Sequence, residues 1–114
     1  MAKLSDTTLT AIFKLLRQLA EEIEDASATE WVLFERYGET PRTISELEEL
    51  QNARERLQDS YSRLNTLLLR TLQAQPLVSD AMLNLLVEAI ERGQTNLDST
   101  HASIQEVKRG WNLP

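Results

Sequence analysis

The single histidine of the chain, His101, follows Asp98 by three residues, in a stretch that we expect to be helical. Side chains at this spacing share one side of a helix, and such a carboxylate–histidine pair is one part of the ligand set of di-iron bundles. Such a site needs a matching pair on a second helix and inward carboxylates from two more, and the sequence offers only the one pair. The acidic cluster that contains Glu21 could bind a cation only weakly. A metal-binding or enzymatic bundle centred on Glu21, Asp98 and His101 is therefore the weakest of three functional hypotheses.

Other chemistry-bearing patterns are missing from the sequence. It contains no Gly-rich phosphate loop, hydroxyl nucleophile motif or zinc-ligand spacing, and it has no cysteine. We therefore expect no enzyme activity, no cofactor, no bound metal and no small-molecule substrate.

Charge and hydropathy narrow the classes of partner. The net charge is −6, and the 12 Lys and Arg are scattered among 18 Asp and Glu, which argues against a cationic face for nucleic acid. The opening residues MAKLSDTT lack the pattern of a secretory signal, and no apolar run is long enough to cross a membrane. Together with the absence of cysteine, this favours a cytoplasmic protein that contacts neither nucleic acid nor membrane.

Three stretches of the chain carry apolar residues at alternating intervals of three and four, which is typical of coiled coils. Because the intervals match when the second stretch is read backwards, the three series can be stacked into common layers, such as Leu16, Leu64 and Ile90. The first series is Leu9, Ile12, Leu16, Leu19, Ile23, Ala26, Glu30, Leu33 and Tyr37; the second is Thr71, Leu68, Leu64, Tyr61, Leu57, Arg54, Leu50, Leu47 and Thr43; the third is Leu83, Leu86, Ile90, Gly93, Leu97, Thr100, Ile104, Val107 and Trp111. This pattern predicts antiparallel neighbours joined by short turns.

The fold expected from these series is all-α: an antiparallel three-helix bundle of long helices, coiled-coil-like and of spectrin-like elongation. We expect one domain over residues 1–114, with helices at about 6–37, 41–73 and 79–109. Gly38 is expected to end the first helix, Thr40 or Thr43 to cap the second and Ser79 to cap the third. Cap-like residues near Ser27 and the glycine at 93 could break two helices, but the periodicity crosses both without a shift and predicts continuity. A dimer that pairs or swaps helices is the structural alternative.

Three layers contain residues that are unusual in a core. Arg54 lies one layer away from Glu30, and helical side chains lean toward the N-terminus of their own helix, so on antiparallel helices the two point toward each other. We therefore predict a partly buried structural ion pair, with a polar binding hole within the bundle as the alternative. Tyr61 shares a layer with Gly93, which predicts that the ring fills the space left by the missing side chain.

Apolar residues outside the layers indicate where a partner could bind. Phe13, Leu15 and Leu67 flank the layers, and we expect them to complete the core. Four residues point further outward and are the candidate partner-binding residues: Leu69 and Leu85 near the end that carries Pro76, and Trp31 and Val32 near the opposite end. The leading hypothesis is a small cytoplasmic protein–protein interaction module, such as an adaptor, regulatory or chaperone-like subunit, acting through an exposed helix face. Its partner would be another protein or a second copy. The alternative is a homo-oligomeric structural protein with no separate ligand.

Overall fold

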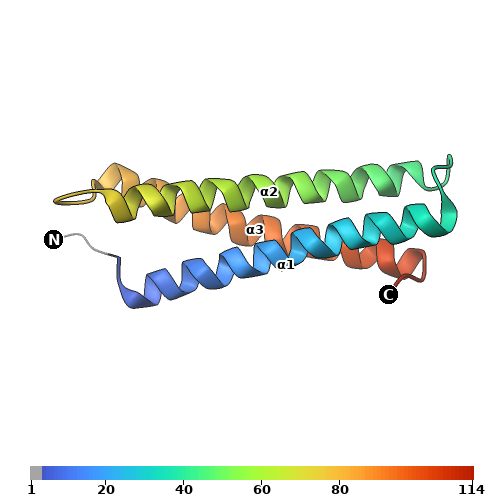
Figure 1. Cartoon of the computed structure of the whole chain (residues 1–114), viewed down its shortest axis with the longest axis horizontal. Coiled ribbons are helices and arrows are strands. Elements are labelled where there is room, and N and C mark those ends of the chain that lie inside the picture. Colours follow the sequence, from blue (N-terminus) through green and yellow to red (C-terminus); the bar gives the residue numbers. More distant parts are fainter. Residues whose placement is uncertain (1–3) are drawn as a thin grey trace.

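The computed structural model describes residues 4–114, which form three long helices packed side by side (Figure 1). They are α1 (Asp6–Tyr37), α2 (Ile44–Gln73) and α3 (Asp80–Gly110), with 32, 30 and 31 residues. α2 runs against α1 and α3, and the rod measures 56 × 21 × 17 Å. The predicted all-α three-helix bundle is confirmed, and α1 and α3 are continuous through Ser27 and Gly93.

Side-chain and glycine signals mark three of the helix ends. Ser5 and Ser79 are in extended conformation, and their hydroxyl groups accept from the N–H groups of Thr8 and Met82, each at 3.1 Å. These bonds satisfy backbone donors that have no partner in the first turn of a helix. At the other end of α1, Gly38 takes a positive φ of 69° that glycine adopts without steric cost, and its N–H donates to Phe34 O at 2.8 Å.

α2 begins at Ile44, three residues later than the sequence predicts. The hydroxyl oxygen of Thr40 accepts from the N–H groups of Arg42 and Thr43, each at 3.2 Å, so Thr40 closes a separate turn over residues 41–43. Thr43 makes no side-chain cap for α2: its backbone is helical (φ −97°, ψ −17°), and its hydroxyl accepts from Thr40 N–H at 2.9 Å and donates to Gly38 O at 2.7 Å. The two threonines thus hold the α1–α2 connection together instead of extending the helix.

The last turn of α3 ends in a Schellman arrangement. Asn112 has a φ of 53°, and the N–H of Leu113 donates to Lys108 O at 2.8 Å across the helix end. A contact between two aromatic rings closes the bundle at this end. The ring centroids of Trp111 and Tyr37, which were predicted to share a layer, are 5.0 Å apart. Tyr37 keeps 44% of its surface exposed, whereas Thr43 of the same layer is 1% exposed, so the two rings cover the end of the core above a buried threonine.

The core consists of the predicted layers and one flanking column. In heptad notation the layer residues occupy positions a and d, position g precedes a, and position e follows d. Most a and d side chains are buried, and so are several g residues: Leu15, Thr29, Ala53, Ser60, Leu67 and Ala89. The buried apolar residues form two clusters that are separated at the layer of Ala26, Arg54 and Thr100, where two polar side chains interrupt the apolar interior.

Gly93 is buried against α1 and not against Tyr61, which corrects the prediction. A methyl group placed on Gly93 would lie 3.2 Å from Leu15 Cδ2 and 3.8 Å from Leu19 Cδ1. These are its nearest neighbours, whereas Tyr61 remains partly exposed at the edge of the core. The layer assignment of Leu19 is right, but the space left by the glycine is used by leucines, with Leu15 entering from a g position.

Candidate binding groove between α1 and α2

The flank of the α1/α2 interface is formed by e positions, and these side chains remain exposed. Phe13 and Phe34 of α1 are 54% and 48% exposed, and Ile44 and Leu72 of α2 are 41% and 47% exposed. Phe13 was expected to complete the core, and that expectation is wrong. Leu15 and Leu67, which were expected there too, occupy g positions and are 4% and 5% exposed. The bundle closes over its g residues and leaves its e residues outside.

A groove of about 520 Å³ follows this flank at the end of the rod that carries the Gly38 turn. Its apolar lining consists of Trp31 and Phe34 from α1 and Ile44 and Leu47 from α2. The remaining lining residues are polar or acidic: Ser27, Glu30, Glu39, Glu48 and Gln51. None of the nine is basic, so the groove combines an apolar surface with a negative charge. We call it the α1/α2 groove.

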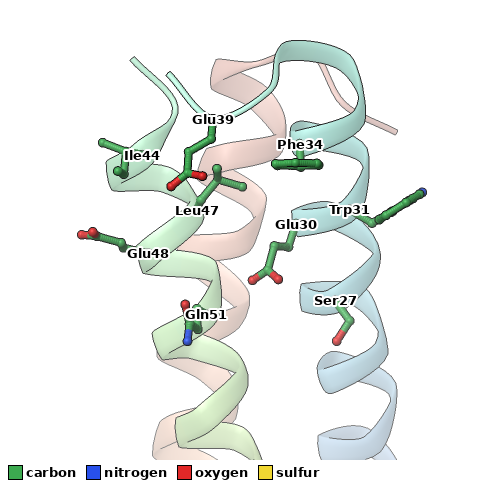
Figure 2. Close-up of a pocket in the computed structure, with 9 residues that line it drawn as sticks. All are labelled: Ser27, Glu30, Trp31, Phe34, Glu39, Ile44, Leu47, Glu48 and Gln51. Carbon is green, nitrogen blue, oxygen red and sulfur yellow. The ribbon is translucent and has the colours of Figure 1, made fainter. Parts of the chain in front are cut away.

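Figure 2 shows how these side chains divide between floor and rims. Phe34, Glu30 and Leu47 lie in the space between the two helices, and Glu39 reaches down into it from the α1–α2 connection. Trp31 extends outward on the α1 side, whereas Ile44 and Glu48 extend outward on the α2 side. Both aromatic side chains therefore come from the α1 side of an open channel, whereas the acidic side chains come from α1, the connection and α2.

The predicted pair between Arg54 and Glu30 lies at the inner end of this channel. Arg54 Nη1 donates to Glu30 Oε1 at 3.1 Å, and the two side chains keep 33% and 28% of their surface exposed. The pair is only partly buried because the groove admits solvent to Glu30. Within residues 4–114 no ion pair is found for Glu39 or Glu48, so these two carboxylates carry the groove's uncompensated charge.

The four candidate partner-binding residues lie toward both ends of the rod, as the sequence places them. Trp31 is 64% exposed and lines the α1/α2 groove, whereas Val32 is partly buried and is not among the lining residues. Leu69, 49% exposed, is beyond the lining of this groove, near the opposite end of α2. Leu85, 40% exposed, directly precedes the d residue Leu86 and lies on the outer side of α3, next to the g column that faces α2. Only Trp31 of the four belongs to the groove.

Phe34, Ile44 and Leu47 complete the apolar lining and were not among the predicted binding residues. Phe34 and Ile44 carry a recognisable pattern, because each directly follows a d position and therefore falls on the e column. Which flanking column faces outward depends on how the helices are arranged around the core. The sequence pattern alone does not contain that information, so g and e residues could not be separated in advance.

The residues of the metal or enzyme hypothesis gather in a smaller polar groove between α1 and α3. Its lining includes Glu21, Glu22, Asp98 and His101, and His101 Nδ1 lies 2.9 Å from Glu22 Oε1. Asp98 accepts a hydrogen bond from Gln94 Nε2 at 3.0 Å. In the part of the chain that the structure describes, no three His, Cys, Asp or Glu side chains are close enough to hold a metal ion. The Glu22–His101 contact joins two helices, and nothing beside it marks a reaction centre.

Comparisons with protein-family models, with curated proteins and with solved structures find no significant match to this chain. The described helices also contain no segment with the length and apolarity needed to cross a bilayer. A functional assignment therefore depends on the geometry of the α1/α2 groove.

Proposed function

We propose that this chain is a small cytoplasmic protein–protein interaction module that binds a partner protein through the α1/α2 groove. Exposed aromatic side chains support this proposal most directly, because Trp31 and Phe34 are 64% and 48% exposed and both line the same groove. Tryptophan is among the residues that contribute most to binding at protein interfaces. A rigid pair of helices that presents such side chains around a channel suits the docking of a partner segment.

Binding is a better proposal than catalysis for the same surface. General acid–base chemistry needs a group placed within reach of a substrate in a site that excludes water, and the carboxylates of the groove are set along an open channel. The aromatic and aliphatic lining instead offers apolar area that a partner would remove from water, which favours association and offsets part of the entropic cost of binding.

The experiment is affinity capture from the native source with matched variants. Wild type, Trp31→Ala, Phe34→Ala and Leu85→Ala are compared at equal concentration, with circular dichroism as the check that each is folded. We expect the two groove variants to lose the captured partner and Leu85→Ala to retain it, since Leu85 is exposed but lies on another flank. Unchanged capture by both groove variants would show that this groove is not the binding surface.

A homo-oligomeric structural role is the second candidate, and the opposite end of the rod favours it. Phe13, Leu69, Leu72, Leu77 and Val87 are all about half exposed there. Sedimentation velocity at several concentrations separates the two proposals. If the protein is a monomer at all concentrations, the structural role is contradicted. If it forms an oligomer that is lost in Leu72→Ala but kept in Trp31→Ala, self-association occurs at this end and the groove remains free for a partner.

A further inference from the structure

The α1/α2 groove has a chemical character that narrows its occupant. Its four apolar side chains are accompanied by three carboxylates and by no basic residue. Arg54 compensates only Glu30, so Glu39 and Glu48 remain to attract positive charge on the rim. Complementary charges across an interface select the partner and steer its approach.

The shape of the groove suits a helix. The lining spans Ser27 to Phe34 on α1 and Ile44 to Gln51 on α2, which at 1.5 Å per residue is roughly 10 Å along each helix, or about two helical turns. Both walls are helices, and their exposed e positions are the ones that an additional helix would cover if it packed into the interface as a fourth member of the bundle. A helix in such a groove inserts apolar residues spaced three and four apart.

A second copy of this chain does not fit the groove by charge. In a twofold symmetric contact the same patch meets itself, so Glu39 and Glu48 of one copy would face the same carboxylates of the other. The chain as a whole has a net charge of −6, which adds to this repulsion. The occupant that fits best carries positive charge beside its apolar stripe.

We infer that the α1/α2 groove binds a basic amphipathic helix of another protein, with an apolar stripe two turns long on the groove floor and Lys or Arg beside Glu39 and Glu48. This inference rests on the proposed function and adds the class of partner to it. Phe34 and Leu47 would contact the apolar stripe, and Trp31 would cover it from the α1 rim.

The test uses three synthetic peptides of about fifteen residues, because shorter helices are marginally stable in water. The first is a Leu/Lys amphipathic helix, the second has Glu in place of every Lys, and the third has the composition of the first with its apolar residues scrambled so that they form no stripe. None contains tryptophan. In Trp111→Phe the only tryptophan left is Trp31, so its emission reports directly on the groove.

We expect the Leu/Lys helix to shift the Trp31 emission to shorter wavelength and the other two peptides to leave it unchanged. Binding should weaken with added salt, because exposed charges are screened beyond about 10 Å at 0.1 M ionic strength. Glu39→Lys/Glu48→Lys should lower the affinity by roughly tenfold or more, which corresponds to about 1.4 kcal/mol per factor of ten. Glu88→Lys/Glu91→Lys is the matched control, since it makes the same change in charge at exposed positions of α3 outside the groove.

Three results would overturn the inference. Equal weakening by the two charge-reversal variants would show that the peptide responds only to net charge. If the Glu peptide bound as tightly as the Leu/Lys helix, the partner would not need positive charge. If the scrambled peptide bound as tightly, the partner would not need an apolar stripe along a helix. An unchanged Trp31 emission with all three peptides would exclude such a helix altogether. In each case the capture experiment with Trp31→Ala and Phe34→Ala still decides separately whether the groove binds a protein.

Discussion

The two antiparallel interfaces of the bundle use equivalent a and d positions but differ at their flanks. Where α2 meets α3, g residues close the interface: Ala53, Ser60, Leu67 and Ala89 are buried. Where α1 meets α2, e residues flank the interface, and Phe34, Ile44 and Leu72 stay exposed. One flank of the bundle is thus closed by buried side chains, whereas the other leaves large apolar side chains exposed.

Polar contacts at the flanking positions differ as well, although the pair Arg54–Glu30, at a positions, crosses the α1/α2 interface beneath the groove. On the α2/α3 flank, Asn96 Nδ2 donates to Ser60 Oγ at 2.8 Å, and Arg56 Nη2 donates to Asn96 Oδ1 at 3.1 Å and to Ser99 Oγ at 3.0 Å. On the α1/α2 flank, Gln51 Nε2 reaches only Glu55 of its own helix, at 3.4 Å. The side chains that close one interface are thus connected across it, whereas Gln51, which lines the open groove, is not.

The largest expected effect is a difference in stability between alanine variants of two leucines in α2. Leu67→Ala, at a g position that is 5% exposed, should lower the free energy of unfolding by about 2–5 kcal/mol, because it leaves a cavity in the core. Leu72→Ala, at an e position that is 47% exposed, should cost less than about 1 kcal/mol. Urea unfolding followed by circular dichroism measures both. Equal losses would contradict the division of the flanks.

The next effect concerns the ion pair beneath the groove. Arg54→Leu or Glu30→Leu alone should cost about 1–3 kcal/mol, below the 3–5 kcal/mol of a fully buried pair, because solvent reaches both side chains. The double variant should lose less than the sum of the two single losses, since the second substitution removes a charge that the first has left without its partner. Thermal and urea unfolding of all four proteins complete the cycle. Strictly additive losses would exclude a coupled pair.

The smallest effect compares two amides. Asn96→Ala should cost about 0.5–1.5 kcal/mol, because it removes the hydrogen bond to the buried Ser60 and one partner of Arg56. Gln51→Ala on the open flank should change the free energy of unfolding by less than about 0.5 kcal/mol. Both values come from the same urea titrations. A larger loss for Gln51→Ala would mean that the groove side chains contribute to the fold as well as to binding.

Prediction from sequence succeeded where it depended on local or periodic patterns. The layers that contain Leu16, Leu64 and Ile90 follow from spacing alone, and Ser79 was identified as a cap because its hydroxyl precedes a helical pattern. The start of α2 was misplaced because residues 41–43 form a separate turn closed by Thr40, with Thr43 bonded to both Thr40 and Gly38, and this arrangement depends on the path of the connection. The filling of the space at Gly93 was misassigned for a similar reason, since a g residue entered from a neighbouring helix.

The spacing of apolar residues is enough to predict the number and pairing of the helices and their approximate bounds, because it sets which side of each helix avoids water. Which flanking column is buried depends on the packed structure, because a and d positions leave e and g equivalent until three helices pack around one core. That packing places Leu67 inside and Phe34 outside, and it brings Trp31, Phe34 and Ile44 together with Glu39 and Glu48 in the α1/α2 groove.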